Sequence, residues 1–185
     1  MSYNKGINFI RGDFTHMNSD YSVRGLTLSD LESVEKLDEL SGDGVSQWVG
    51  DLEEDEISDY AWGLFHNDEL IGYCTTGEAD DAPDDMQKHP GYDNMQLILS
   101  DVYVKPEYRK QGLGTYMCVT AMHNRFEIEG PYANYIYATL LYDELIAFYG
   151  KFGFDWIDGP DYAIVASKED INIAYEKLQQ EGMNL

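Results

Sequence analysis

Apolar residues recur along the chain with two different spacings, which predict alternating strands and helices. Runs rich in β-branched and aromatic residues predict strands at residues 21–26, 60–65, 70–75, 97–104, 133–141, 152–156 and 162–166. Apolar positions three or four residues apart predict helices within residues 29–41, 43–56, 115–126, 143–150 and 168–181. Strands and helices in this order predict a mixed α/β sheet flanked by helices.

Turn and capping residues mark the ends of several of these elements. Ser29 can cap the first helix, and Gly42 can end it. Residues 66–69 predict the turn of a β-hairpin. The polar stretch 77–95 is rich in Asp, Gly and Pro, and a loop of this length inside a domain is usually functional or disordered.

Length and composition agree with one globular domain. The chain has 185 residues, of which 43% are hydrophobic, enough to bury a sizeable core. We expect an N-terminal arm over residues 1–20, a domain over 21–168, and a C-terminal helix within 169–185 that packs on the domain. No stretch has the length and hydrophobicity of a membrane helix, and the chain starts without a signal-peptide pattern. The two cysteines, Cys74 and Cys118, form no metal or redox motif. Two such cysteines in a chain without a signal-peptide pattern predict a cytoplasmic protein with reduced thiols.

The charge of the chain narrows its possible partners. Thirty-five acidic residues against twelve basic ones give a net charge of −23. Such a chain repels polyanions, which argues against binding to nucleic acid. The acids either keep the protein in solution or attract a cationic partner, and composition alone leaves both open.

The stretch 97–126 carries the most specific chemistry. A predicted strand is followed by a turn at Lys105-Pro106, a segment with Gly112 and Gly114, and a helix. A helix start after such a turn presents free backbone N–H groups that bind phosphate or pyrophosphate. Glycine lets the backbone approach the ligand without a Cβ clash. Taken alone, the same pattern is also typical of an ordinary turn into a helix.

Two segments give the chain a family resemblance. Residues 104–114, VKPEYRKQGLG, resemble the acetyl-CoA signature of the GNAT superfamily of N-acetyltransferases, a strand ending V-x-P followed by R/Q-x-x-G-x-G/A and a helix. Residues 148–154, FYGKFGF, resemble the second signature of that family, LYEKLGF. The resemblance covers roughly residues 21–168. It implies the GNAT fold, a mostly antiparallel mixed sheet of about seven strands that splay at the cofactor site, with acetyl-CoA as co-substrate.

The resemblance also implies roles for the residues of the first signature. The turn and the first helical turn would hold the cofactor pyrophosphate, and the strand before them would bind the pantetheine arm through its backbone. Many members carry an Asn that contacts the cofactor seven residues before the tyrosine of the second signature. That tyrosine is Tyr149 in this chain, and the position of the Asn is taken by Tyr142. The cofactor-binding residues implied in this way are Val102, Tyr103, Val104, Arg109, Lys110, Gln111, Gly112, Leu113, Gly114, Thr115 and Tyr142.

Acetyl transfer to an amine needs a group that takes the amine proton and a group that protonates the leaving thiolate. The resemblance makes Tyr149 the acid, and a core aromatic is the alternative. Asp101 is the candidate for the amine end because it lies near the point where the strands should splay. A solvated residue at a strand edge is the equal alternative. Polyamine-acetylating members often carry Glu-Asp where this chain has Ser100-Asp101, so the usual glutamate base is missing from its place. The other candidate bases are Glu78, Asp158 and Asp161, on loops that could face the acceptor.

Acids and tryptophans gather where the family admits its acceptor, between the N-terminal helices and the last hairpin. We expect Trp48, Glu54, Trp156 and Asp158 to bind the acceptor, because carboxylates and indole rings suit a cation. This predicts a cationic amine, such as a polyamine, an aminoglycoside-like molecule, or a lysine or peptide amine. The histidines are scattered along the chain, so no metal site is indicated.

Two functions remain open at this point. The first is an acetyl-CoA-dependent N-acetyltransferase in which the amine attacks directly. The second is a degenerate member that binds CoA without turnover, or an acidic protein-interaction module, and the missing glutamate and Tyr142 favour it. The apolar stripe on the last helix either packs within the chain or forms a dimer, so a monomer and a homodimer both fit. The residues of this stripe are Ile171, Ala174, Tyr175 and Leu178.

Overall fold

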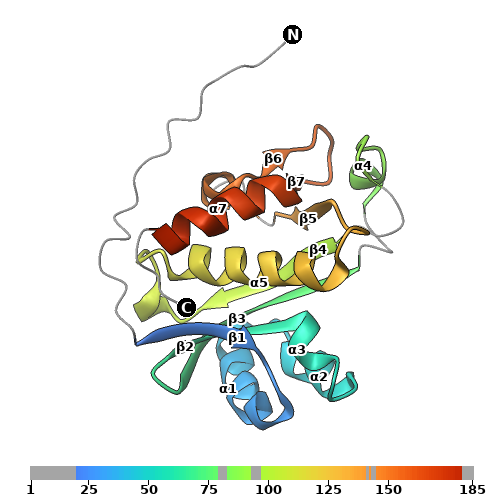
Figure 1. Ribbon diagram of the computed structural model, residues 1–185. Helices are drawn as coiled ribbons and strands as arrows, with labels where there is room; N and C mark the ends of the chain where they lie inside the picture. The colour runs from blue at the N-terminus through green and yellow to red at the C-terminus, as the bar shows by residue number, and fades with distance from the viewer. Residues whose placement is uncertain (1–19, 79–82, 93–96, 141, 143–144, 181–185) are drawn as a thin grey trace.

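The computed structural model describes residues 20–78, 83–92, 97–140, 142 and 145–180 (Figure 1). The strands are β1 (Tyr21–Gly25), β2 (Ala61–His66), β3 (Glu69–Glu78), β4 (Leu97–Val104), β5 (Tyr135–Thr139), β6 (Asp155–Trp156) and β7 (Ala163–Ser167). The α-helices are α1 (Leu31–Ser41), α2 (Val45–Asp51), α3 (Ile57–Tyr60), α4 (Asp84–Gln87), α5 (Leu113–Glu129), α6 (Ile146–Tyr149) and α7 (Lys168–Gln180). The 3-10 helices are η1 (Leu28–Asp30), η2 (Pro106–Tyr108) and η4 (Gly150–Phe152). The predicted arm lies outside the described residues except for Asp20, as do parts of the predicted loop.

In the described part of the chain, seven strands form one sheet in the order β1-β2-β3-β4-β5-β7-β6. β4 and β5 are parallel, and the other neighbouring pairs are antiparallel. A parallel pair needs a crossover connection, which α5 supplies. The predicted fold class, a mostly antiparallel mixed sheet flanked by helices, is confirmed.

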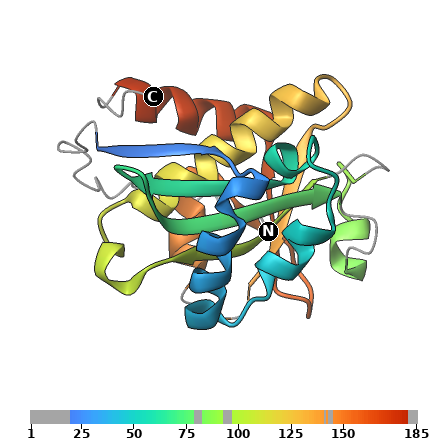
Figure 2. The same ribbon diagram turned by 90° about the horizontal axis from the view of Figure 1, so that it is seen from below.

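Helices cover both faces of the sheet. α5 and α7 lie on one face, and α1, α2 and α3 lie on the other (Figures 1 and 2). Side chains alternate between the two faces along β2, because successive residues of a strand point in opposite directions. Leu64 is buried in the core that includes α5, and Phe65 is buried in the core that includes α1. The sheet therefore separates two cores.

α5 is the central helix of the larger core. It starts after Gly112, whose φ of 83° is a left-handed conformation that glycine adopts without strain. α7 packs beside it, with Ile171 and Leu178 buried in the same core. Tyr175 of α7 stacks on His123 of α5 with ring centroids 3.8 Å apart. The apolar stripe of the last helix thus packs within the chain.

A network around Asp30 fixes the start of the first helical segment, where our prediction of Ser29 as the cap was wrong. Ser29 lies inside η1, and its hydroxyl bonds to that of Thr27 at 2.7 Å. Asp30 accepts the Thr27 N–H at 2.9 Å and both terminal nitrogens of Arg24 at 2.8 Å. A carboxylate can accept several charge-assisted bonds at once, which a serine hydroxyl cannot. The hydrogen bonds from Arg24 also lower the pKa of Asp30.

Several boundaries differ from the sequence expectation. The short helix α3 precedes β2, α4 lies within the predicted loop, and α5 continues to Glu129. β6 has only two residues, because Phe152 and Phe154 leave the predicted strand and enter the core. Their ring centroids lie 5.6 and 5.5 Å from that of Tyr149. Burial of these aromatic rings outweighs their preference for a strand.

Replacing Asp30 with Asn should lower the free energy of unfolding by about 1–2 kcal/mol at pH 7. Hydrogen bonds to a charged group contribute about 1.5–3 kcal/mol, and solvent around the half-exposed Arg24 reduces this. Because folding lowers the pKa of Asp30, its contribution is present above the unfolded pKa and is lost as pH falls through the folded pKa. Denaturant unfolding should therefore show wild type and variant converging below about pH 4.

The matched control is Glu32→Gln, which breaks the exposed Glu32–Lys36 pair. It should leave the unfolding midpoint unchanged, because exposed ion pairs contribute little. A difference between wild type and Asp30→Asn that does not change with pH would contradict the charge-based role of Asp30.

Candidate functional site

The sheet opens between β4 and β5. These strands pair at Leu97 with Ile136 and at Ile98 with Tyr137, and then separate. On its other side, β4 stays paired with β3 as far as Val104. Among the described residues, the edge of β4 that faces β5 therefore has no strand partner over its second half, and the expected splay of the sheet is present.

A bulge in β4 lies beside this opening. The register between β3 and β4 shifts between Tyr73 and Thr75. Within this irregular stretch Asp101 has a φ of 48°, which is uncommon for a residue other than glycine. A bulge changes the direction of a side chain relative to a regular strand. Asp101 is thus set apart from the alternating pattern of its neighbours.

The last residues of β4 can bind a ligand through their backbone. The Lys105 N–H donates to Ile71 O of β3 at 2.9 Å. Because backbone groups alternate along a strand, those of Val102 and Val104 point to the other side, toward the opening. The side chains of Tyr103 and Val104 are buried in the two cores.

The loop between β4 and α5 is held by its own side chains. Arg109 donates from Nε to Val104 O at 2.7 Å and lies over the Tyr103 ring, 5.3 Å from its centroid. Gln111 donates from Nε2 to Glu107 O at 3.1 Å. Both side chains turn back into the loop, so they shape it from within.

The start of α5 has backbone N–H groups without a partner in the helix. Lys110 and Gly112 both have positive φ, 61° and 83°, which curves the chain just before the helix. The N–H groups of Leu113, Gly114 and Thr115 belong to the first turn and have no acceptor within the helix. The partial positive charge at the N-terminus of this 17-residue helix favours an anion there. The arrangement fits a phosphate group, recognised mainly by the backbone.

Asp101 carries a perturbed carboxylate at the bulge. Its Oδ2 accepts the hydroxyl of Thr75 at 2.7 Å. The residue keeps contact with solvent, yet the surrounding protein desolvates the carboxylate and raises its pKa. The charges of Asp43 and Asp38 raise the pKa further, and the Thr75 bond opposes them. A carboxylate with a raised pKa is a stronger base than an ordinary one.

A second group of carboxylates near Asp101 was missed in the sequence. The hydroxyl of Tyr73 lies 2.9 Å from Asp38 Oδ1 and 3.2 Å from Asp43 Oδ2, and 2.6 Å from the Ser41 hydroxyl. Burial raises the pKa of Tyr73, so its phenol stays protonated. In the sequence, the two aspartates resemble solvent-facing residues around the end of a helix. Only the packing of α1 on β3 brings Tyr73 to them, so no local pattern could have identified the group.

Tyr149 lies in an aromatic cluster on the segment that follows β5. It is 7% exposed and packs edge-on against Phe148, Phe152 and Phe154. Burial raises the pKa of its phenol, and the neighbouring thiols of Cys118 and Cys74 raise it further. The side chain is therefore a neutral hydrogen-bond donor around neutral pH.

The two cysteines lie together, although they are far apart in the sequence. Cys74 of β3 and Cys118 of α5 are free thiols, and both are fully buried. Burial raises the pKa of Cys74, with further contributions from Cys118 and Asp101. Cys74 thus lies within electrostatic range of both Asp101 and Tyr149.

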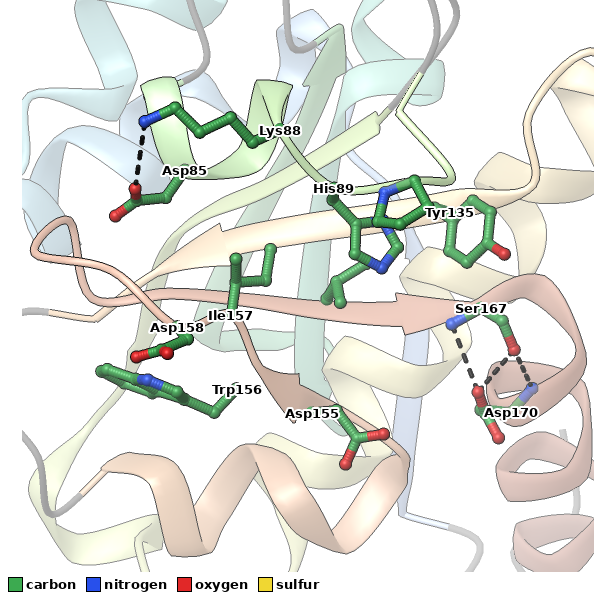
Figure 3. Close-up of a pocket in the computed structure, with 12 residues that line it drawn as sticks. Asp85, Lys88, His89, Tyr135, Asp155, Trp156, Ile157, Asp158, Ser167 and Asp170 are labelled. Carbon is green, nitrogen blue, oxygen red and sulfur yellow. Dashed lines mark hydrogen bonds and ion pairs between the residues drawn. The ribbon is translucent and has the colours of Figure 1, made fainter. Parts of the chain in front are cut away.

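A cavity of about 380 Å³ lies against β5, β6 and β7 (Figure 3). It includes two of the four residues that we expected to bind the acceptor, Trp156 and Asp158. The other two lie elsewhere. Trp48 is in α2, 6.5 Å from the Tyr60 ring, and Glu54 is exposed after α2.

One wall of the cavity comes from α4 and the residues that follow it. The Asp85 side chain is almost fully buried, and its Oδ2 accepts the Asp161 N–H at 3.0 Å. Lys88 lies 3.8 Å from the same carboxylate. Gly159 passes so close that a Cβ there would lie 1.9 Å from Asp85 Oδ2. The described part of the predicted loop thus holds the turn between β6 and β7.

Comparison with known families identifies the fold and its relatives. The family described as "Acetyltransferase (GNAT) domain" matches residues 58–155, more than half of the chain. This chain belongs to the GNAT acetyltransferase family. Among curated proteins, no sequence matches it significantly.

Solved structures of GNAT proteins resemble this chain in fold. A mutant AtaT toxin bound to the C-terminus of the antitoxin AtaR is 16% identical, with a TM-score of 0.61, over 85% of this chain and 99% of that one. NAA60 of Arabidopsis thaliana in complex with acetyl-CoA is 16% identical, with a TM-score of 0.58, over 80% and 99%. YhbS of Escherichia coli in complex with CoA is 17% identical, with a TM-score of 0.57, over 85% and 88%. At these identities the likeness concerns the fold.

Three further observations complete the description of this GNAT chain. Tyr142, implied as a cofactor contact, is 66% exposed just after β5. Within the described ranges, no three His, Cys, Asp or Glu side chains are grouped as a metal site. Across the same ranges, no helix combines the length and hydrophobicity that crossing a bilayer requires.

Gly159→Ala should destabilise this GNAT domain by about 1–3 kcal/mol, the usual cost of overpacking. The new Cβ would displace the Asp85 carboxylate and break its bond to the Asp161 N–H. Thermal unfolding measures the loss. Gly150→Ala is the matched control, because a Cβ at Gly150 meets no atom within 4 Å and its φ is −60°. Equal melting temperatures for the two variants would contradict the close contact between α4 and the β6–β7 turn.

Proposed function

We propose that the protein is an acetyl-CoA-dependent N-acetyltransferase that transfers an acetyl group to a primary amine by direct attack. The observation that carries this proposal is a convergence of groups at the opening of the sheet. An anion-binding helix start, a carboxylate with a raised pKa and a protonated phenol come from three different elements. Membership of the GNAT family supports the same reaction.

The residues around the opening fit the co-substrate. The N–H groups at the start of α5 suit the pyrophosphate, and Gly112 and Gly114 keep side chains away from it. The backbone of Val102 and the N–H of Val104, which have no partner strand on this side, suit the amides of the pantetheine arm, as an added strand would. When bound, acetyl-CoA supplies a thioester whose carbonyl carbon accepts the amine.

Asp101 is proposed as the group that receives the amine proton, directly or through one water molecule. An alkyl amine has a pKa near 10.4, so it arrives as ammonium and must lose a proton before it attacks. The ionised carboxylate of Asp101 first attracts the ammonium and then accepts its proton. The raised pKa of Asp101 makes the carboxylate a stronger proton acceptor in the second step. The Thr75 hydroxyl holds the carboxylate in place.

Tyr149 is proposed as the hydrogen donor to the leaving thiolate. Its raised pKa keeps the phenol protonated until negative charge develops on the sulfur. The three phenylalanines around it exclude water and fix the ring. An oriented donor in a dry site stabilises developing charge without reorganisation.

A cationic amine is the acceptor class that the charges favour. Asp38 and Asp43 lie close enough to Asp101 to influence its pKa, and in the described chain no Lys or Arg forms an ion pair with any of the three. An incoming ammonium group would relieve their mutual repulsion. The amine proposed is therefore cationic and primary.

A CoA-binding protein without turnover is the second candidate function. Ser100 stands where polyamine-acetylating members often carry Glu, and Tyr142 stands where many carry Asn. This candidate predicts binding of acetyl-CoA without release of free thiol. It also predicts that Tyr149→Phe, like the wild type, releases no free thiol above background.

Acetyl-CoA at about 100 times its dissociation constant should stabilise the protein by about 2.7 kcal/mol, visible as a higher melting temperature. Free-thiol release with a panel of primary amines then measures turnover. Tyr149→Phe should keep the melting shift and lower turnover by about 10²–10⁴, since the ring packing stays and only the hydroxyl is lost. No melting shift with acetyl-CoA would count against both candidate functions, and a shift without thiol release would favour the second.

Asp101→Asn should lower kcat/KM by about 10²–10⁴ and remove the acid-side limb of its pH profile. The base is active when ionised, so kcat/KM of the wild type rises as pH increases through the raised pKa of Asp101. The limb at higher pH, from the amine itself, should remain in the variant. Thr75→Val removes the hydrogen bond that lowers this pKa, so it should move the acid-side limb to higher pH. An acid-side limb that persists in Asp101→Asn would exclude Asp101 as the base.

A further inference from the structure

The end of the β2–β3 hairpin lies against the segment that leads into α5. Figures 1 and 2 both show the hairpin turn at the same end of the sheet as that segment. His66 is the last residue of β2 and Glu69 the first residue of β3, and the two are direct partners across the turn. Because direct partners in an antiparallel pair point to the same face of the sheet, both side chains are directed to one side.

These two partners hold both ends of η2. Lys105 directly precedes η2, and Tyr108 is its last residue. Glu69 forms an ion pair with Lys105, whose side chain is only 17% exposed. The Tyr108 hydroxyl lies 3.2 Å from His66 Nδ1, within hydrogen-bond distance. One cross-strand pair of the hairpin therefore brackets the turn at which the chain leaves β4 for α5.

His66 is itself fixed by aromatic packing. Its ring stacks on that of Tyr21 in β1, with centroids 4.7 Å apart and planes inclined by 21°. The Tyr108 ring meets the His66 ring edge-on at 5.6 Å. Tyr21 and Tyr108 both pack against the larger core. A ring held by packing on one side and by a hydrogen bond on the other gives the loop a rigid support.

The shape of the loop matters for the anion site at the start of α5. The segment 109–112 alone connects Tyr108 to that helix. Lys110 and Gly112 within it have positive φ, so the direction of the helix start depends on where the segment begins. If a binding-competent shape is occupied only part of the time, the apparent dissociation constant rises by the inverse of that fraction. A support that keeps the loop in one shape therefore increases affinity without touching the ligand.

We propose that His66 is a positioning residue for acetyl-CoA, which holds the loop before α5, through Tyr108, in the shape that receives the pyrophosphate. The proposal rests on the proposed function, because it places the co-substrate at the start of α5. His66 lies outside both signature segments, 104–114 and 148–154, and its action on the co-substrate is indirect. Its effect is therefore on co-substrate binding and not on the chemical step.

Binding of CoA to the full chain, measured by isothermal titration calorimetry, tests this role without requiring turnover. His66→Phe keeps a ring on Tyr21 and removes the Nδ1 atom, so it should raise the Kd for CoA about three- to tenfold, the contribution of one hydrogen bond. Tyr108→Phe removes the other partner and should raise the Kd by the same factor. The double variant should bind as each single variant does, because all three lack the same bond.

Two further variants separate positioning from stability. His66→Asn, whose side-chain amide can take the place of Nδ1, should restore most of the affinity. The matched control is His123→Phe, because His123 Nδ1 lies 3.0 Å from Asn172 Oδ1 and its ring stacks on Tyr175. This control also loses one hydrogen bond and keeps one stacked ring. It should lower the melting temperature about as much as His66→Phe and leave the Kd for CoA unchanged.

Steady-state kinetics give a second measurement. In His66→Phe the KM for acetyl-CoA should rise, while kcat and the KM for the amine stay at the wild-type values, because only uniform binding of the co-substrate is lost. S-acetylpantetheine lacks the pyrophosphate, so wild type and variant should use it with equal kcat/KM. If His66→Phe does not fold, Tyr108→Phe provides the same comparison.

The outcomes separate this inference from the proposed function. CoA binding that weakens in His66→Phe and Tyr108→Phe, with no acetyl transfer to any amine, would support the positioning role and contradict the acetyltransferase. Acetyl transfer with an unchanged Kd in both variants would overturn the positioning role and keep the enzyme. Additive losses in the double variant, or an equal loss of affinity in His123→Phe, would also overturn it. No CoA binding by the wild type would overturn both.

Discussion

The separation of β4 from β5 is the constraint on which the rest of the structure depends. Within the described residues these parallel strands pair at only two positions, which leaves a backbone edge without a partner strand in the middle of the sheet. Buried backbone groups need partners, so such an edge must be completed by the chain or by a ligand. Arg109 completes part of it by donating to Val104 O. The same crossover that makes the pair parallel delivers the N-terminus of α5 to the open end. The opening and the anion site are therefore two results of one connection.

The groups proposed for chemistry come from elements that pack around this opening, and they are held there at a cost in stability. The carboxyl of Asp101 has a higher pKa folded than unfolded, so its ionised form opposes folding, increasingly as pH rises through that pKa. Burial raises the pKa of Tyr149 and of Cys74, so both stay in their neutral forms. Structural needs alone would not favour an ionisable carboxylate in such a place. Perturbed groups that converge at an opening are typical of functional sites.

Local signals predicted the fold and the anion site, and long-range packing determined what the sequence missed. Gly112 and the segment 148–154 have short-range patterns, so the helix start and the family were accessible from sequence. The cluster of Asp38 and Asp43 depends on Tyr73, a residue more than thirty positions away. Ser29 is a residue type that often caps helices. Asp30 fixes the helix start instead, because its carboxylate also accepts hydrogen bonds from Arg24 of β1. The predicted cofactor, catalytic and acceptor residues stay predictions, and the structure adds that two of the acceptor residues share one cavity.

The inward-turned side chains of the loop before α5 have a consequence for how this chain can diverge. If the co-substrate is recognised by N–H groups that every residue except proline possesses, most side chains at the helix start carry no information about it. Selection then acts there on backbone shape alone, through a few positions such as Gly112. The cavity under α4 differs in this respect, because its charge and its aromatic surface come from side chains. One half of such a molecule can keep its ligand while its sequence drifts, and the other half can change its ligand through a few substitutions.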